Sequence, residues 1–472
     1  MIRGRAPRSI SEFAPALILV VAALTTGCKM GPDFEPPAPI TPAEYRGDAP
    51  EGESIANLDW WDLYQDPVLQ DLIRAGLTNN RSLRESMARI NEARAGLGIV
   101  RADLFPQVNL VGIGMYQETL GSDSVSALDN LKVAAAASYE VDLWGRVARS
   151  NEAALQGLLA TEEAFRTVTV ALVGDIASAY LVLRDLDARI GIAEATLATR
   201  GRSLELLTAR AEGGLIAELE VKRTEINVAD TEAVMQRLVR GRSQTENVLR
   251  LLVGELPGEV QRGASLEDQV LPPTVPPGLP SDLLLRRPDV LAAERMLHAQ
   301  TAKIGVAEAA RFPSLSLTAS TGAKSTSLGE LVSSNVFLNL GANLIGPLFN
   351  AGKSKSFVEA ERARTEQALN RYELVVLNAF REVSDALVGV ETFRAEHEAR
   401  LRQLASSREA EASVQALFDG GLVSYEEVLD LQRAVFGAEL MVSEALQAHH
   451  TSIVQLYKVL GGGWSPTDEL GS

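Results

Sequence analysis

Glu427 and Asp430 are the two residues of this chain whose type and spacing most clearly suggest a function. They lie three positions apart just after a Gly-Gly turn, and in a helix this spacing places both carboxylates on one face. If copies of the chain surround a common axis, the pair forms rings of like charge, which attract cations and resist crowding. The alternative is a solvated helix face on which Glu427 partly serves as a capping residue with Ser424.

Cys28 is the second residue with a distinctive chemistry. It follows residues 1–27, which have the pattern of a secretory signal: arginines at 3, 5 and 8, an apolar stretch at 14–24, and the small residues Thr26 and Gly27. A cysteine directly after such a signal is typical of bacterial lipoproteins, so the sequence predicts lipidation of Cys28 and anchoring by acyl chains in a membrane leaflet. The alternative is an ordinary exported protein with an incidental cysteine.

Composition excludes several other kinds of function. The chain carries 45 Lys and Arg against 62 Asp and Glu, a formal net charge of -17, which argues against nucleic acid as a partner. One cysteine allows no internal disulfide and no thiolate metal cluster. The four histidines show no spacing of a metal site or catalytic dyad: His298, His397, His449 and His450. We therefore expect no enzyme, no catalytic residue, no metal and no cofactor.

Two long stretches, Arg146 to Leu207 and Lys353 to Ala416, carry apolar residues at heptad spacing without an interrupting proline. This pattern places a narrow apolar seam along one edge of a helix, which must then pack lengthwise on other helices. Some sixty residues at 1.5 Å rise give a helix of about 90 Å. By itself, a long coiled coil says nothing about function.

The two stretches belong to an internal duplication. Adding 207 to a residue number in the first half repeatedly gives the matching residue of the second half. Matching pairs include Phe105-Pro106 with Phe312-Pro313, Gly145 with Gly352, Glu220 with Glu427 and Gly254 with Gly461. A register held over this distance predicts two copies of one structural unit.

Between the helices of each copy, the periodicity changes to strict alternation. In Val133–Leu143, Leu315–Ala319 and Val336–Leu344, apolar residues alternate with small or polar ones, and Gln107–Gln117 is a less regular fourth segment. Such segments are typical of transmembrane β-strands, although a soluble sheet would explain any single one. Four strands cannot close a barrel, and open edges are not tolerated in lipid, so we expect the chain to oligomerise.

Turns and prolines divide the rest of the chain. Gly-Gly turns follow both long helices, and return helices run back from them. The predicted organisation is a signal peptide (1–27), a lipidated N-terminus with a Pro-rich linker (28–58), a first repeat (59–254), a Pro-rich strap (255–280), a second repeat (281–461) and a C-terminal tail (462–472). Within the repeats we expect β-hairpins at about 107–143 and 313–346 and long helical hairpins at about 146–253 and 353–460.

A resemblance to a known family follows from the stretch Gly278 to Val290, which reads GLPSDLLLRRPDV. It resembles the hallmark of the TolC-type outer membrane factors, and more narrowly of the OprM/NodT-like outer membrane efflux lipoproteins. Further matching features are Cys28 before Gly31-Pro32-Asp33, the pair Trp60-Trp61, the stretch Val141 to Arg146 and both Gly-Gly turns. The resemblance covers nearly the whole mature chain.

The resemblance implies a mainly α-helical fold with a β-barrel portion. Members are homotrimers, whose four strands per chain give a 12-stranded transmembrane β-barrel continuous with a long periplasmic α-helical coiled-coil barrel. It implies the outer membrane channel of a tripartite RND-type efflux system, which passively conducts drugs, other small molecules or metal ions from the periplasm to the outside. Its partners would be a periplasmic adaptor (membrane fusion) protein, an inner-membrane RND transporter and outer membrane lipid.

The resemblance also assigns roles to residues. Glu427 and Asp430 would contribute to a periplasmic gate. The turns would contact the adaptor through Gly213, Gly214, Leu215, Gly420, Gly421, Leu422 and Ser424. Two other functions stay open: an outer membrane duct for type I protein secretion and, less well supported, a periplasmic coiled-coil adaptor or scaffold, which would normally have one helical hairpin where this chain has two.

Overall fold

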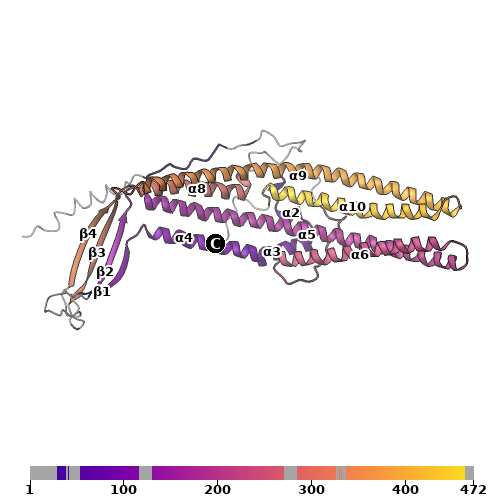
Figure 1. Cartoon of the computed structure of the whole chain (residues 1–472), viewed down its shortest axis with the longest axis horizontal. Coiled ribbons are helices and arrows are strands. Elements are labelled where there is room, and N and C mark those ends of the chain that lie inside the picture. Colours follow the sequence, from indigo (N-terminus) through magenta and orange to yellow (C-terminus); the bar gives the residue numbers. More distant parts are fainter. Residues whose placement is uncertain are drawn as a thin grey trace, which may run out of the picture. The chain divides into compact units, whose positions relative to one another are not determined.

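The computed structural model describes residues 29–38, 41, 54–115, 130–270, 284–325, 329, 331 and 336–462 (Figure 1). Their contacts form two compact units, here called unit 1 (residues up to 38, 89–162 and 292–373) and unit 2 (39–88, 163–291 and 374–472). Each unit takes segments from both copies of the duplication. The two copies are therefore interleaved, and neither unit corresponds to one copy.

Unit 1 contains a four-stranded antiparallel sheet in the order β1-β2-β3-β4. The strands are β1 (Gln107–Met115), β2 (Asn130–Val141), β3 (Ser314–Ser325) and β4 (Val336–Ile345). Strands β1 and β2 form the hairpin of the first copy, and β3 and β4 form that of the second. Pairing of β2 with β3 joins the two hairpins.

The helices next to this sheet are α4 (Arg81–Ala102), α8 (Pro288–Ala309) and the first parts of α5 (Arg146–Glu212) and α9 (Lys353–Asp419). Small residues let them approach closely: Ala153 and Ala160 of α5 and Ala302 and Ala309 of α8 are all buried. Among the described helices, only α5 has a stretch long and apolar enough to cross a membrane, and half of that stretch is buried, as in a core helix.

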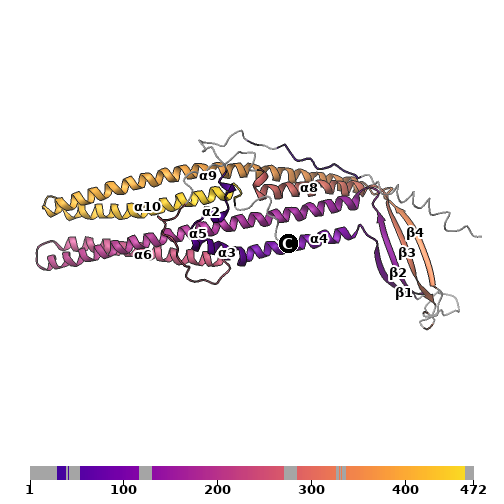
Figure 2. The same ribbon diagram turned by 180° about the vertical axis from the view of Figure 1, so that it is seen from behind.

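Unit 2 contains the two long helical hairpins (Figures 1 and 2). In the first, α5 runs back along α6 (Glu218–Leu252), and in the second α9 runs back along α10 (Tyr425–Val459). The short elements η2 (Ile55–Asn57), α2 (Trp60–Leu63) and α3 (Pro67–Asn79) belong to the same unit. One apolar cluster combines Ile190 and Ala193 of α5, Leu238 of α6 and Phe436 of α10, so the two hairpins share a core.

The duplication holds at the level of single residues. Helices α4 and α8 each have 22 residues, α5 and α9 each have 67, and α6 and α10 each have 35. Every boundary of the second copy's helices lies 207 positions after its counterpart. The hairpin registers agree as well, because Gln107 pairs with Ser138 and Ser314 pairs with Ile345.

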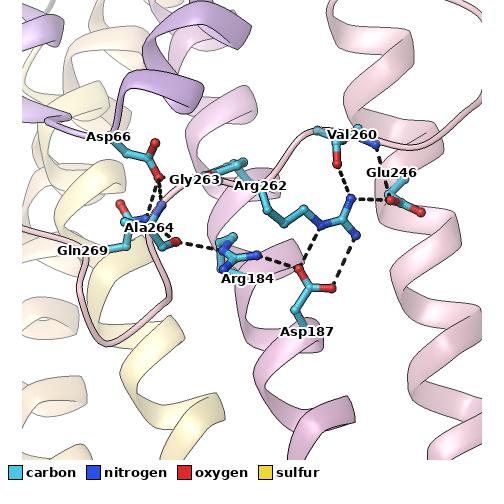
Figure 3. A network of polar contacts seen from close by, with 10 residues as sticks. Asp66, Arg184, Asp187, Glu246, Val260, Arg262, Gly263, Ala264 and Gln269 are labelled. Carbon is cyan, nitrogen blue, oxygen red and sulfur yellow. Dashed lines mark hydrogen bonds and ion pairs between the residues drawn. The ribbon is translucent and has the colours of Figure 1, made fainter.

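Residues 255–270, the described part of the strap, have no helix or strand and are fixed to unit 2 by polar contacts (Figure 3). Arg262 bonds to Asp187 of α5 at 3.0 Å and to Glu246 of α6 at 2.6 Å. Asp66, the N-cap of α3, accepts hydrogen bonds from the Ala264 N–H and from Gln269. Irregular backbone needs such partners because it satisfies few of its own hydrogen bonds.

Asp66 is the centre of this attachment. Its carboxylate also accepts hydrogen bonds from the Tyr180 hydroxyl and the Val68 N–H, at 2.8 and 2.9 Å. Burial by itself would raise the pKa of Asp66, but the hydrogen bonds from Gln269, Tyr180, Val68 and Ala264 outweigh burial and lower it. The carboxylate therefore stays ionised and holds three parts of the chain together.

Candidate functional site

Both Gly-Gly turns have the same tight geometry at the ends of the long hairpins. Gly214 and Gly421 have φ angles of +71° and +73°, which glycine adopts without strain. The N–H groups of Leu215 and Leu422 each donate back to a carbonyl of the last helical turn at 2.9 Å, as in a Schellman motif. The same leucines are 77% and 75% exposed, so each turn presents an apolar side chain to its surroundings.

Glu427 and Asp430 lie in the first turns of α10, close to the second Gly-Gly turn, and both are exposed. Asp430 accepts a hydrogen bond at 2.8 Å from Arg433, which partly compensates its charge. Glu427 forms no salt bridge within the described part of the chain. Of the two predicted gate residues, Glu427 therefore carries the less compensated charge.

The expected cap involving Ser424 and Glu427 is not formed. Ser424 occupies the N-cap position with extended backbone angles, but its side chain makes no capping hydrogen bond. Ser424 and the acidic residues after it are exposed, so water can satisfy the free N–H groups of this first turn. The spacing of Ser424 and Glu427 predicted the start of α10 correctly, but the predicted capping hydrogen bond of the Ser424 side chain is wrong.

Two polar contacts join the first hairpin to the second near these turns. Arg223 of α6 forms a salt bridge with Glu426 of α10 at 2.6 Å. Arg433 of α10 donates from Nε to the Asn227 side-chain oxygen of α6, also at 2.6 Å. The arginine that pairs with Asp430 thus also bonds to the other hairpin. We call these two contacts the hairpin latch.

A buried arginine lies behind the hairpin latch. Arg200 of α5 is 4% exposed and donates to the Thr231 hydroxyl at 2.6 Å and to the Asn227 carbonyl at 3.0 Å. Its guanidinium stacks over the Phe436 ring of α10 at 5.2 Å. Burial lowers the pKa of Arg200, and none of the described carboxylates lies within salt-bridge distance of it. The more distant charges of Asp230 and Glu411 offset part of this burial, and the hydrogen bonds and the aromatic ring satisfy the guanidinium directly.

This polar layer exists in one copy only. The residues 207 positions after Arg200, Asn227 and Thr231 are Ser407, Ala434 and Ala438. Their neighbourhood is an apolar cluster of Leu404, Val435 and Ala438. The two hairpins therefore have different interiors at matching positions. The sequence signal was a set of polar residues interrupting the apolar seam of the first copy.

The described part of the family-like motif has a structural role in unit 2. Arg287 is 7% exposed, bonds to Glu382 of α9 at 2.8 Å, and donates to the carbonyl of Val459 at the end of α10. Its counterpart in the first copy is Asn80, which donates to the carbonyl of Leu252 at 2.8 Å. Both residues satisfy a carbonyl at a helix end that would otherwise have no partner.

Residues 29–34 bind in a site of unit 1 that sequence reasoning missed. The guanidinium of Arg149 at the start of α5 is 2% exposed and contacts the carbonyls of Met30 and Gly31 and the carboxylate of Asp33. The Met30 N–H donates to the Trp144 carbonyl at 3.1 Å. We call this site the N-terminal dock. Because its partners are more than a hundred residues apart, no local pattern indicated it.

Close backbone contacts complete the N-terminal dock. A Cβ atom on Gly31 would lie 2.4 Å from the Cα of Gly305 in α8, and one on Gly145 would lie 2.8 Å from the Cα of Lys29. Phe34 stacks on His298 with the ring centroids 4.3 Å apart. Cys28, the predicted lipidation site, lies outside the described residues, one position before this docked segment.

Comparison with known proteins places these features in a family. The family model described as "Outer membrane efflux protein" matches residues 72–255 and again 279–462. Outer membrane protein OprJ of Pseudomonas aeruginosa is 36% identical over 474 residues, 96% of each chain. The solvent efflux pump outer membrane protein SrpC of Pseudomonas putida is 35% identical over 452 residues, 93% of this chain and 96% of SrpC.

The cation efflux system protein CusC of Escherichia coli K12 is 32% identical over 448 residues, 94% of this chain and 98% of CusC. A crystal structure of CusC, also 32% identical, superposes with a TM-score of 0.85 over 92% of this chain and 100% of that chain. These similarities confirm the predicted fold class, a trimeric channel with four strands per chain and a long helical barrel. The chain belongs to the outer membrane efflux protein family, and it is an outer membrane channel component of an efflux system.

Proposed function

We propose that this chain is the passive exit duct of a tripartite RND-type pump, which delivers drugs, other small molecules or metal ions from the periplasm to the outside. The observation that carries the proposal is the family match over both copies, together with relatives named for solvent and cation efflux. The partners are a periplasmic adaptor protein and an inner-membrane RND transporter. The transporter selects the substrate, because a duct of this build contacts its cargo only weakly.

Two features control the resting duct at the turns: an acidic ring and the hairpin latch. Glu427 and Asp430, repeated in three copies, surround the axis with like charge that attracts cations. The hairpin latch holds α10 against α6 through Arg223–Glu426 and Arg433–Asn227. Opening moves the second hairpin away from the first and breaks the latch. Because Arg433 contacts both Asp430 and Asn227, the charge ring and the latch change together.

The turns are the contact site of the adaptor. Leu215 and Leu422 are the most exposed apolar side chains of the two turns, and burying them against a partner is favourable at about 25 cal/mol per Å² of apolar surface. Ser424 and the four glycines expose backbone next to them, on which an adaptor can form hydrogen bonds: Gly213, Gly214, Gly420 and Gly421. An adaptor bound at the turns lies close enough to the hairpin latch to stabilise or break its contacts.

Lipidation of Cys28 completes the attachment to the outer membrane. The N-terminal dock supports this role, because it fixes Lys29 and Met30 directly after the cysteine. A single acyl chain holds a protein only marginally at a membrane, whereas several chains together with a barrel hold it firmly. The anchor acts beside the barrel, and the residues that hold the docked segment belong to the same compact unit as the sheet.

Complementation tests the function directly. The chain is expressed, together with a periplasmic adaptor and an RND transporter of the same organism, in a strain that lacks its own outer membrane efflux channels. We expect resistance to that transporter's substrates to be restored, and a variant of the transporter without proton coupling to abolish it. Restored protein secretion with a type I exporter, without any gain of resistance, would favour the secretion duct and refute the efflux proposal.

A further inference from the structure

Two lysines of the sheet have no role in the proposed function. Lys132 of β2 and Lys324 of β3 are direct partners in the antiparallel pairing of these strands. Like charges in such a pair destabilise a sheet, because the two Cβ atoms lie only about 4.5–5.5 Å apart. Neither lysine forms a salt bridge with any carboxylate of the described residues. The pair therefore lacks an internal partner that would remove the repulsion.

Both lysines lie on the polar face of the sheet. The other face carries exposed apolar side chains in the alternation of lipid-facing strands, and on β4 they are Val336, Leu338, Leu340 and Leu344. Leu340 pairs with Ala319, which assigns the odd-numbered residues of β3 to this apolar face. Lys324 and its partner Lys132 therefore lie on the opposite face, which lines the lumen in a closed barrel of this family.

The two lysines also lie at the outer end of the strands. Lys132 is close to the start of β2 and Lys324 close to the end of β3, whereas the opposite strand ends lead to the periplasmic helices. The only other charged residue of the described strands is Glu140, near the periplasmic end of β2, and it pairs with Arg146 at 2.7 Å. The strands thus carry uncompensated positive charge in a chain whose net charge is -17.

An aromatic ring holds the ammonium group of Lys132 over the sheet. Its Nζ lies 4.8 Å from the centroid of the Phe337 ring on β4, which is two strands away. Phe337 is the pairing partner of Gly322 on β3, so the lysine reaches the ring past a residue without a side chain. A Cβ atom on Gly322 would lie 2.1 Å from the Val133 carbonyl oxygen, so only glycine fits there. The ring attracts the cation without neutralising its charge, which stays available to an anion.

We propose that Lys132 and Lys324 form an anion-binding ring in the lumen, near the outer end of the barrel. The trimeric channel repeats the pair around its axis, and rings of basic side chains are a known device of anion-selective pores. The ligand is a small anion in transit, whose carboxylate or phosphate oxygens accept charge-assisted hydrogen bonds from the ammonium groups. An anion bound between the paired lysines also removes their repulsion. The outer end of the duct therefore prefers anions.

Thiol labelling of intact cells tests the position of the ring. A charged, membrane-impermeant maleimide is added to the medium, and the wild-type chain controls for Cys28. Lys324→Cys should be labelled, and so should Ser320→Cys on the same face of β3. Thr321→Cys, on the apolar face, is the matched control, and we expect at least about tenfold less labelling there because the reactive thiolate does not form in lipid. Equal labelling of Ser320→Cys and Thr321→Cys, or none of Lys324→Cys, would overturn the luminal position.

Recording in planar bilayers tests the charge of the ring. Lys132→Gln with Lys324→Gln removes both charges, whereas Lys132→Arg with Lys324→Arg keeps them, and all channels also carry Glu427→Ala with Asp430→Ala so that the acidic ring does not set the selectivity. A unit charge about 4 Å away changes the local concentration of a monovalent ion about fivefold even in water, so the cation-to-anion permeability ratio in a KCl gradient should rise at least about fivefold in the Gln variant. Tripolyphosphate should block the lysine and Arg channels at concentrations at least about tenfold lower than the Gln channel.

The ring and the proposed pump are judged separately, because the ring depends only on the channel. Lack of block by tripolyphosphate in the channel that keeps both lysines would overturn the ring, and so would an equal change of permeability in the Gln and Arg variants. The yield of trimers in the outer membrane controls for folding, which the loss of a like-charge pair should not impair. Block and anion preference in a channel that fails in complementation would support the ring and count against the pump. Restored resistance without block or anion preference would leave the pump intact and refute the ring.

Discussion

Breaking the hairpin latch should open the duct in a measurable way. The Arg433–Asn227 bond has a charged donor and an acceptor residue that is 2% exposed, so it contributes about 1.5–3 kcal/mol. The Arg223–Glu426 pair is partly exposed and contributes only about 0.2–1 kcal/mol. If both contacts break on opening, removing about 2 kcal/mol of this stabilisation from the closed state of each chain shifts the equilibrium towards opening about 30-fold per chain, since 1.4 kcal/mol is tenfold.

The assay is single-channel recording of Arg433→Ala and Arg223→Ala in planar bilayers. We expect Arg433→Ala to raise the open probability strongly and Arg223→Ala weakly. Raising the salt from 0.1 to 1 M shortens the screening length from about 10 to about 3 Å, so it should imitate Arg223→Ala but not Arg433→Ala. Arg408→Ala is the matched control, because Arg408 pairs with Glu439 inside the second hairpin at 2.7 Å. An equal effect of Arg408→Ala, or none of Arg433→Ala, would refute the latch.

Four further predictions concern other parts of the chain. Glu427→Ala with Asp430→Ala should raise single-channel conductance because the smaller side chains widen the gate, and unchanged conductance would remove the gate assignment. Cys28→Ser should abolish acyl labelling while trimers stay detectable, and persistent labelling would disprove that site. Arg149→Met should lower the free energy of unfolding by about 3 kcal/mol and make residues 29–38 sensitive to protease. Lys355→Met, at an exposed arm of a surface salt bridge, should do neither. Burial, with His449 and His397 nearby, lowers the pKa of His450 from 6.5 to about 4, so the unfolded chain binds the proton first as the pH falls. The free energy of unfolding should therefore decline from pH 6.5 towards pH 4, by about 2 kcal/mol at pH 5. His450→Gln should flatten this decline, as measured by thermal unfolding at each pH.

The features that follow local rules could be predicted from the sequence. Apolar residues at heptad spacing without proline indicated α5 and α9, and Gly214 and Gly421 indicated where those helices turn back. The strands followed from alternation. The register of 207 residues carried every assignment from one copy to the other, which is why the second copy's boundaries could be inferred from the first.

Contacts between distant segments could not be predicted in this way. Arg149 binds backbone carbonyls 118 and 119 positions before it, and backbone carbonyls carry no sequence signature. Arg200 interrupts the apolar seam of the first copy, but only the packing of α6 and α10 around it shows that it is buried and which groups it binds. Ser424 had the right spacing for a cap, but an exposed helix start is equally well solvated by water.

The equal lengths of paired helices limit how such a channel can evolve. Both hairpins have 67 residues in the outgoing helix and 35 in the returning one. A heptad inserted in one helix would move its turn by about 10 Å and leave the matching turn behind. A longer or shorter channel of this build therefore requires the same number of heptads to be gained or lost in α5, α6, α9 and α10 together. Length should therefore change in this family by rare, concerted steps.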